Sequence, residues 1–143
     1  MQRKLAALVA LPITAVLLGS CAEAVSDAYV IEDDPGTVEH VDGSEIGRVI
    51  LADGAAERLR VQTSSVSREG RRLVVPQAAV FVDPDGVWWV YTNPEPDVYV
   101  RHEVAVEHQR DGLALLSSGP RPGADVVTVG VAELYGIEAE VGH

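Results

Sequence analysis

The residue whose chemistry is most readily inferred from this sequence is Cys21, because its thiol is the only one in the chain. It follows the small residues Gly19 and Ser20 at the end of an uncharged, apolar run over residues 5–18, and two basic residues precede that run. A basic start, an apolar stretch too short to span a bilayer comfortably and small residues before a cut point make up a secretory signal. We therefore expect residues 1–20 to be a cleaved signal peptide.

The stretch Leu18-Gly19-Ser20-Cys21 resembles a bacterial lipobox, in which the cysteine thiol carries a diacylglycerol. This resemblance implies a lipid on Cys21 and a mature protein anchored in the cell membrane on its extracytoplasmic face, where two acyl chains hold stably. The alternatives are an ordinary secretory signal with an incidental cysteine, or an uncleaved anchor. Because the lipid uses the only thiol, we expect no disulfide and no thiolate metal site.

The four histidines suggest a metal site, but their spacing argues against one. His102 and His108 lie on one face of a predicted strand, and ~3.3 Å per residue places them roughly 20 Å apart, too far to share an ion. His40 and His143 leave a weak surface site with acidic neighbours as an alternative. Soft-metal capture is disfavoured because Met1 is the only methionine. We expect no bound metal and no other cofactor.

Catalytic motifs are missing from the sequence. It has no nucleophile elbow, no zinc-protease helix motif, no P-loop and no dinucleotide-binding glycine pattern. We therefore expect no catalytic residues and a protein that is not an enzyme.

The adjacent tryptophans Trp88 and Trp89 are the candidates for a partner contact. Neighbouring residues of a strand face opposite ways, so one indole is expected to enter the core while the other points outward. The alternative, in which flanking elements cover both rings, is equally favoured.

The charge of the chain narrows its partners. The 143 residues carry a formal net charge of −11, and the first 20 hold two of the 11 basic residues and none of the 22 acidic ones. The remainder therefore carries −13. Binding to nucleic acid depends on clustered Lys and Arg, so we expect no nucleic-acid partner.

A mainly β fold must position these residues. Beyond residue 76, short runs rich in Val, Trp, Tyr and Leu are separated by Gly, Pro and Asp, which is typical of a small antiparallel barrel or sandwich. The clearest element is a hairpin over residues 79–91 that turns at Asp83-Pro84-Asp85-Gly86. One short helix is expected within residues 52–59.

The chain divides into four predicted parts: a signal peptide over 1–20, a flexible acidic tether over 21–44, a helix–strand fragment over 45–70 and a β-domain over 71–143. An edge strand near Val38 is an alternative within the tether.

Four further elements are expected from the apolar pattern. Residues 60–67 and 98–108 each predict one strand, and a helical turn over 131–135 precedes a last strand over 137–141. Hairpin turns are expected at residues 68–71 and at Asp111-Gly112.

Several segments occur in an order that resembles the C-terminal region of periplasmic adaptor proteins, the membrane fusion proteins of efflux and secretion systems. The segments are Val75-Pro76-Gln77-Ala78-Ala79-Val80, the turn at 83–86, Val87-Trp88-Trp89-Val90-Tyr91, the strand through 101–106, and residues 122–130. Residues 55–63 also resemble a short helix and strand near the start of such proteins, with Arg60 where glycine is usual.

The resemblance implies part of an adaptor β-barrel followed by a membrane-proximal β-domain. The chain is too short for the lipoyl-like domain and the long helical hairpin of a full adaptor. The implied function is a lipid-anchored binding module, an accessory subunit that contacts a transporter subunit of an efflux or export system. The alternatives are a surface lipoprotein that binds a small molecule or metal ion, and an enzyme or envelope-remodelling protein.

Overall fold

The computed structural model describes residues 34–40, 43 and 46–141. The predicted signal peptide over 1–20, the lipid attachment residue Cys21 and His143 lie outside these ranges, as does most of the predicted tether. Within them, no helix has both the length and the apolar character needed to cross a bilayer.

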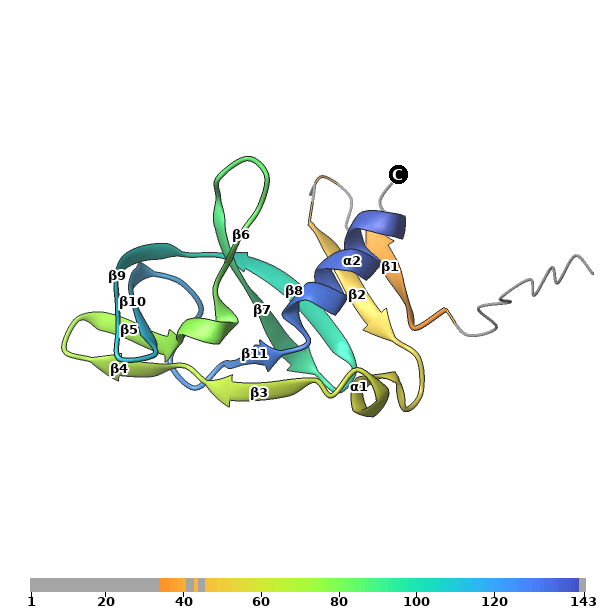
Figure 1. Ribbon diagram of the computed structural model, residues 1–143, viewed down its shortest axis with the longest axis horizontal. Coiled ribbons are helices and arrows are strands. Elements are labelled where there is room, and N and C mark those ends of the chain that lie inside the picture. The colour runs from red at the N-terminus through yellow and green to blue at the C-terminus, as the bar shows by residue number, and fades with distance from the viewer. Residues whose placement is uncertain (1–33, 41–42, 44–45, 142–143) are drawn as a thin grey trace, which may run out of the picture. The chain divides into compact units, whose positions relative to one another are not determined.

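The described chain is mainly β, as the sequence predicts, and its strands form two antiparallel sheets (Figure 1). The first sheet has the strand order β1 (Gly36–His40), β2 (Gly47–Leu51), β8 (Val98–Glu103), β7 (Trp88–Glu95), β11 (Asp125–Val129) and β3 (Gln62–Ser65), with β6 (Phe81–Val82) also paired to β7. The second sheet has the order β4 (Ser67–Glu69), β5 (Arg72–Pro76), β10 (Leu113–Ser118) and β9 (Ala105–Arg110). Both sheets are open, so the fold is sandwich-like and not a closed barrel.

The first sheet has a hydrophobic core on each of its faces. The sheet-side core joins it to the second sheet and consists of Val66, Leu73, Val75, Ala79, Val90, Val104, Ala114, Leu116 and Val126. The helix-side core consists of Val49, Leu51, Ala55, Tyr91, Tyr99, Val127, Leu134 and Ile137. Adjacent residues of β7 and of β11 enter different cores, because successive side chains of a strand point to opposite faces.

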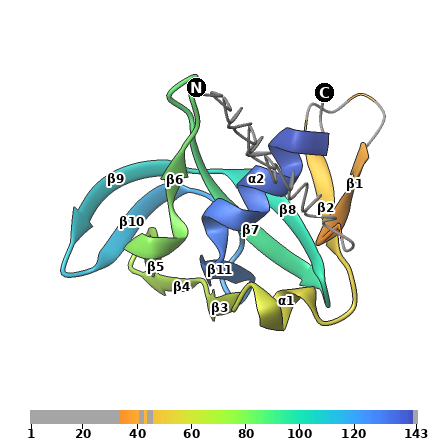
Figure 2. The same cartoon turned by 45° about the vertical axis from the view of Figure 1, so that its right-hand side comes forward.

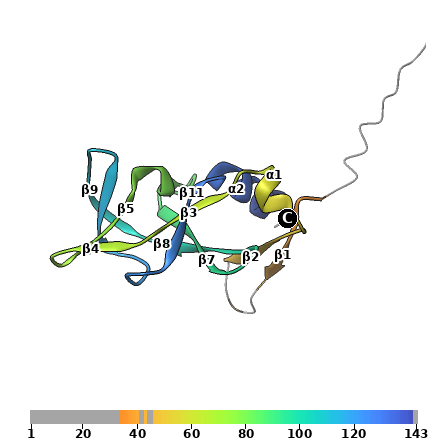
Figure 3. The same cartoon turned by 90° about the horizontal axis from the view of Figure 1, so that it is seen from below.

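Two helices cover the helix-side core. The predicted short helix is α1 (Ala55–Arg58), a single turn with Gly54 as its N-cap. The second is α2 (Val131–Val141), which lies against β1 and β2. Figure 2 shows α2 crossing in front of the first sheet, and Figure 3 shows both helices on the same side of β7, β8 and β2.

The prediction for the C-terminal residues was wrong. A helical turn over 131–135 and a strand over 137–141 were expected, whereas α2 is one helix of 11 residues. Ile137 and the residues after it fit a two-residue period, but the helix buries Leu134 and Ile137 on one face against the sheet. Packing therefore decides between two periods that this short stretch satisfies about equally.

Two of the predicted strands pass from one sheet to the other. The strand expected over 60–67 is divided at Val66 into β3 and β4, and the strand expected over 98–108 is divided at Val104 into β8 and β9. Both valines are buried in the sheet-side core. The backbone of Val66 stays paired at the break, since its N–H donates to Ala124 O at 2.8 Å and its carbonyl accepts from Gly123 N at 2.8 Å.

The N-terminal residues of the described chain belong to the first sheet. The edge strand considered near Val38 is present as β1, which pairs with β2. The predicted boundary between the helix–strand fragment (45–70) and the β-domain (71–143) falls in the turn that joins β4 to β5. These two strands pair with each other. Each of the two sheets contains strands that precede this boundary and strands that follow it.

Candidate functional site

The predicted hairpin over 79–91 is present as β6 and β7, with Phe81 opposite Trp89 and Val82 opposite Trp88. Its turn is fixed by the Asp83 carboxylate, whose Oδ1 accepts hydrogen bonds from Asp85 N at 3.0 Å and Val87 N at 2.9 Å. In Figure 1 the turn extends away from both sheets. These hydrogen bonds hold the tip of the hairpin in one conformation.

The two tryptophans of this hairpin have different surroundings. The Trp88 side chain is 36% exposed and lies opposite Val82, which is 46% exposed. The Trp89 ring is half-buried, and its Nε1 donates to Asp83 Oδ2 at 2.8 Å. The Arg101 guanidinium lies over the Trp89 ring, 4.8 Å from its centroid, in a cation–π contact. Trp89 thus supports the hairpin, while Trp88 and Val82 form an exposed apolar pair.

Asp83 is held in its charged form by this arrangement. Desolvation raises the pKa of the Asp83 carboxyl, but hydrogen bonds from Trp89, Val87 and Asp85 outweigh it and, with the nearby Arg101 charge, hold the pKa below its ordinary value. The turn is therefore expected to weaken when that carboxylate is protonated.

A buried carboxylate links the hairpin to α2. Glu138 accepts hydrogen bonds from Tyr91 Oη at 2.5 Å and Arg101 Nε at 2.9 Å, and its Oε1 lies 3.4 Å from Gly47 N. Glu138 is the one charged residue that is buried in the described part of the chain. Arg101 contacts Glu138 on one side and Trp89 on the other, so the residues from Asp83 to Glu138 form one continuous set of contacts.

The phenol of Tyr91 is a donor in this set. Burial raises the pKa of Tyr91 well above its ordinary value, and the hydrogen bond to Glu138 and the charge of that carboxylate raise it further. A neutral phenol and a guanidinium both donate to Glu138, which satisfies the buried carboxylate. These hydrogen bonds hold Tyr91, Arg101 and Glu138 in fixed positions relative to one another.

The pairing of Tyr91 and Arg101 with Glu138 was not predicted from the sequence. The predicted strand over 137–141 would place Ile137 and Glu138 on opposite faces, whereas α2 brings both to the side of Leu134. The helical spacing of Val131, Leu134 and Glu138 is the signal that was available in the sequence.

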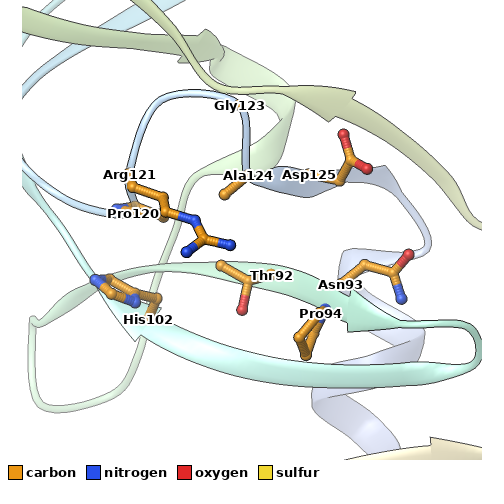
Figure 4. Close-up of a pocket in the computed structure, with 9 residues that line it drawn as sticks. All are labelled: Thr92, Asn93, Pro94, His102, Pro120, Arg121, Gly123, Ala124 and Asp125. Carbon is orange, nitrogen blue, oxygen red and sulfur yellow. The ribbon is translucent and has the colours of Figure 1, made fainter.

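A cavity of about 390 Å³ lies beside strands β7 and β8 of the first sheet (Figure 4). Its lining residues come from β7, from β8, from the loop between β10 and β11 and from the first residue of β11: Thr92, Asn93, Pro94, His102, Pro120, Arg121, Gly123, Ala124 and Asp125. Five of them are polar or charged: Thr92, Asn93, His102, Arg121 and Asp125. Its size suits a small molecule.

The histidines lie apart in the structure. The prediction that His102 and His108 share one strand face was wrong, because β8 and β9 belong to different sheets. In residues 34–40, 43 and 46–141, no group of three His, Cys, Asp or Glu side chains is placed to hold a metal ion.

No protein-family model matches the chain, and no curated protein matches it. The candidate functional features are therefore the exposed Val82–Trp88 pair and the cavity of Figure 4, each established by its own geometry.

Proposed function

We propose that this chain is a lipid-anchored, extracytoplasmic binding module that acts as an accessory subunit of a transmembrane efflux or export system. The observation that carries the proposal is the exposed apolar pair of Val82 and Trp88 on the tip-proximal part of the β6–β7 hairpin. Aromatic residues are enriched at the centres of protein interfaces, where they supply most of the binding energy.

The support of this hairpin suits it to docking. Asp83 closes the turn, and Trp89 is held between Asp83 and Arg101, which in turn is held by Glu138. A contact surface that is already ordered loses less conformational entropy on binding. The order of segments that resembles periplasmic adaptors indicates the class of partner, a transporter subunit at the same membrane.

Site-specific photocrosslinking in intact cells tests this proposal. A photoreactive phenylalanine analogue at position 88 is expected to capture a transporter subunit. The same analogue at Leu113, which is 40% exposed and lies in the second sheet, is the matched control and is expected not to capture it. Equal capture from both positions, or capture of envelope polymers alone, contradicts the proposal.

The lipid anchor has its own measurement. Labelling cells with a radioactive fatty acid is expected to label the chain, and a Cys21→Ala variant is expected to lose the label. If the Cys21→Ala variant still takes up the label, Cys21 is not the site of a lipid anchor.

A second candidate function, a lipoprotein that binds a small molecule, is favoured by the cavity lined by Thr92, His102 and Arg121. It requires no partner protein, so it is tested separately on the purified chain.

A further inference from the structure

The loop that forms one wall of the cavity in Figure 4 is rigidly held. Pro120 is buried, and the two prolines on either side of Arg121 restrict the backbone of the loop. Ala124 N donates to Arg121 O at 3.1 Å, and Gly123 and Ala124 both pair with Val66. The Arg121 side chain therefore extends from a backbone of fixed position.

The Arg121 guanidinium supplies positive charge inside this cavity. Figure 4 shows the side chain extending over Thr92, with His102 to one side of it. Within the described ranges, Arg121 forms none of the ion pairs that hold Arg48, Arg72 and Arg101. A guanidinium with no carboxylate partner is suited to binding a ligand carboxylate, because its planar donors match two carboxylate oxygens.

The opposite part of the cavity presents hydrogen-bond acceptors. Asn93 Nδ2 donates to Glu95 O at 2.6 Å and to Val98 O at 2.9 Å, which leaves its side-chain oxygen as an acceptor. Asp125 Oδ1 accepts from Ser65 Oγ at 2.7 Å, and no hydrogen bond from the described residues occupies its Oδ2. In Figure 4, Asn93 and Asp125 lie on the side of Arg121 that is away from His102. These acceptors favour a ligand cation.

The two parts together define the charge pattern of a ligand. The Arg121 guanidinium and the His102 ring supply donors suited to a carboxylate, while the Asp125 carboxylate and the Asn93 oxygen supply acceptors suited to an ammonium group. Pro94, Pro120 and Ala124 add apolar lining to the same cavity. A volume of about 390 Å³ accommodates a molecule larger than a single small ion.

We propose that this cavity binds a small zwitterion of the amino acid or short peptide class, with its carboxylate on Arg121 and its ammonium group on Asp125. The inference specifies the second candidate function and depends on it. It is independent of docking by the β6–β7 hairpin.

Calorimetric titration of the full chain, purified in detergent, tests this inference with three probes: L-alanyl-L-alanine, its N-acetylated form and its C-terminal amide. The unmodified dipeptide is expected to bind with one site per chain. Each blocked form is expected to bind roughly tenfold more weakly or worse, because a hydrogen bond to a charged group contributes at least that factor.

Matched variants assign the two charges. Arg121→Gln is expected to weaken dipeptide binding roughly tenfold and to abolish the preference over the amide, whereas Arg71→Gln, at an exposed hairpin turn, is expected to leave both unchanged. Asp125→Asn is expected to abolish the preference over the N-acetylated form, and Asp85→Asn is its control.

Three results would overturn the inference. Absence of saturable binding by any probe at millimolar concentration rules out both the inference and the peptide-binding form of the second candidate function. If the N-acetylated form binds as tightly as the unmodified dipeptide, the cavity does not recognise the ammonium group. The zwitterion proposal is then wrong, and only binding of a carboxylate remains. Equal effects of Arg121→Gln and Arg71→Gln place the binding outside this cavity.

Discussion

The sheet-side core contains only aliphatic side chains, whereas the helix-side core surrounds a carboxylate, a phenol and a guanidinium. Both cores use neighbouring residues of the same strands: Val90 and Tyr91 of β7, and Val126 and Val127 of β11. One sheet is thus stabilised by packing alone on one face, and by packing around a polar set on the other.

This difference affects how each face responds to change. An aliphatic core loses stability in proportion to the volume removed, and it tolerates replacements of similar size. A buried polar set loses more when one member is removed, because its partners are left desolvated and unpaired. The helix-side core also contacts the candidate docking hairpin through Arg101 and Trp89, so its damage is expected to reach that surface.

The largest effect is expected from Glu138→Ala. This change leaves the Arg101 charge and the Tyr91 hydroxyl without their buried acceptor, and we expect a loss of about 3–5 kcal/mol in the free energy of unfolding. Urea denaturation measures it. The control is Glu140→Ala, at an exposed position of the same helix, for which a change within about 0.5 kcal/mol is expected.

A slightly smaller effect is expected from Leu116→Ala in the sheet-side core. Leu116 is fully buried, and its truncation leaves a cavity that costs about 3 kcal/mol. Leu116→Met keeps most of the volume and is expected to cost less than about 1.5 kcal/mol. Urea denaturation measures the loss of unfolding free energy in both variants. A smaller loss for Glu138→Ala than for Leu116→Ala would contradict the proposed difference between the two cores.

The smallest effect is expected from Asp83→Asn at the hairpin. A pKa lowered in the folded chain means that the Asp83 carboxylate contributes stability above its ordinary pKa of 3.8, and that this contribution is lost as the pH falls through the lower folded value. The wild-type chain should therefore lose more stability than Asp83→Asn over that acidic window. Urea midpoints measured against pH report the difference, and parallel curves for the two proteins would argue against it.

Local chemistry made part of this fold predictable from the sequence. The hairpin at residues 83–86 and the turn at Asp111-Gly112 follow from residues that favour the backbone angles of a turn, and both are present. The mainly antiparallel β class follows from the spacing of such turns.

Interactions between distant residues were not predictable in the same way. Arg101 and Glu138 are 37 residues apart, and their pairing depends on α2, whose sequence fits a strand period about as well as a helix period. The break at Val104 leaves the alternation of Val98, Val100, Val104 and Val106 undisturbed, so β8 and β9 read as one strand in the sequence. The cavity depends on Arg121 and His102 lining the same space from two different elements, which a linear pattern does not reveal.

The position of β7 between the two cores restricts how the length of this strand can change over evolution. Val90 and Tyr91 lie in different cores, and β7 pairs with β8 from Trp89 to Thr92 without a shift of register. A substitution at either position affects one face. An insertion or deletion of one residue would exchange the two faces, placing the phenol among aliphatic side chains and leaving Glu138 without its donor. Length in β7 is therefore expected to vary less among descendants of this chain than residue identity does.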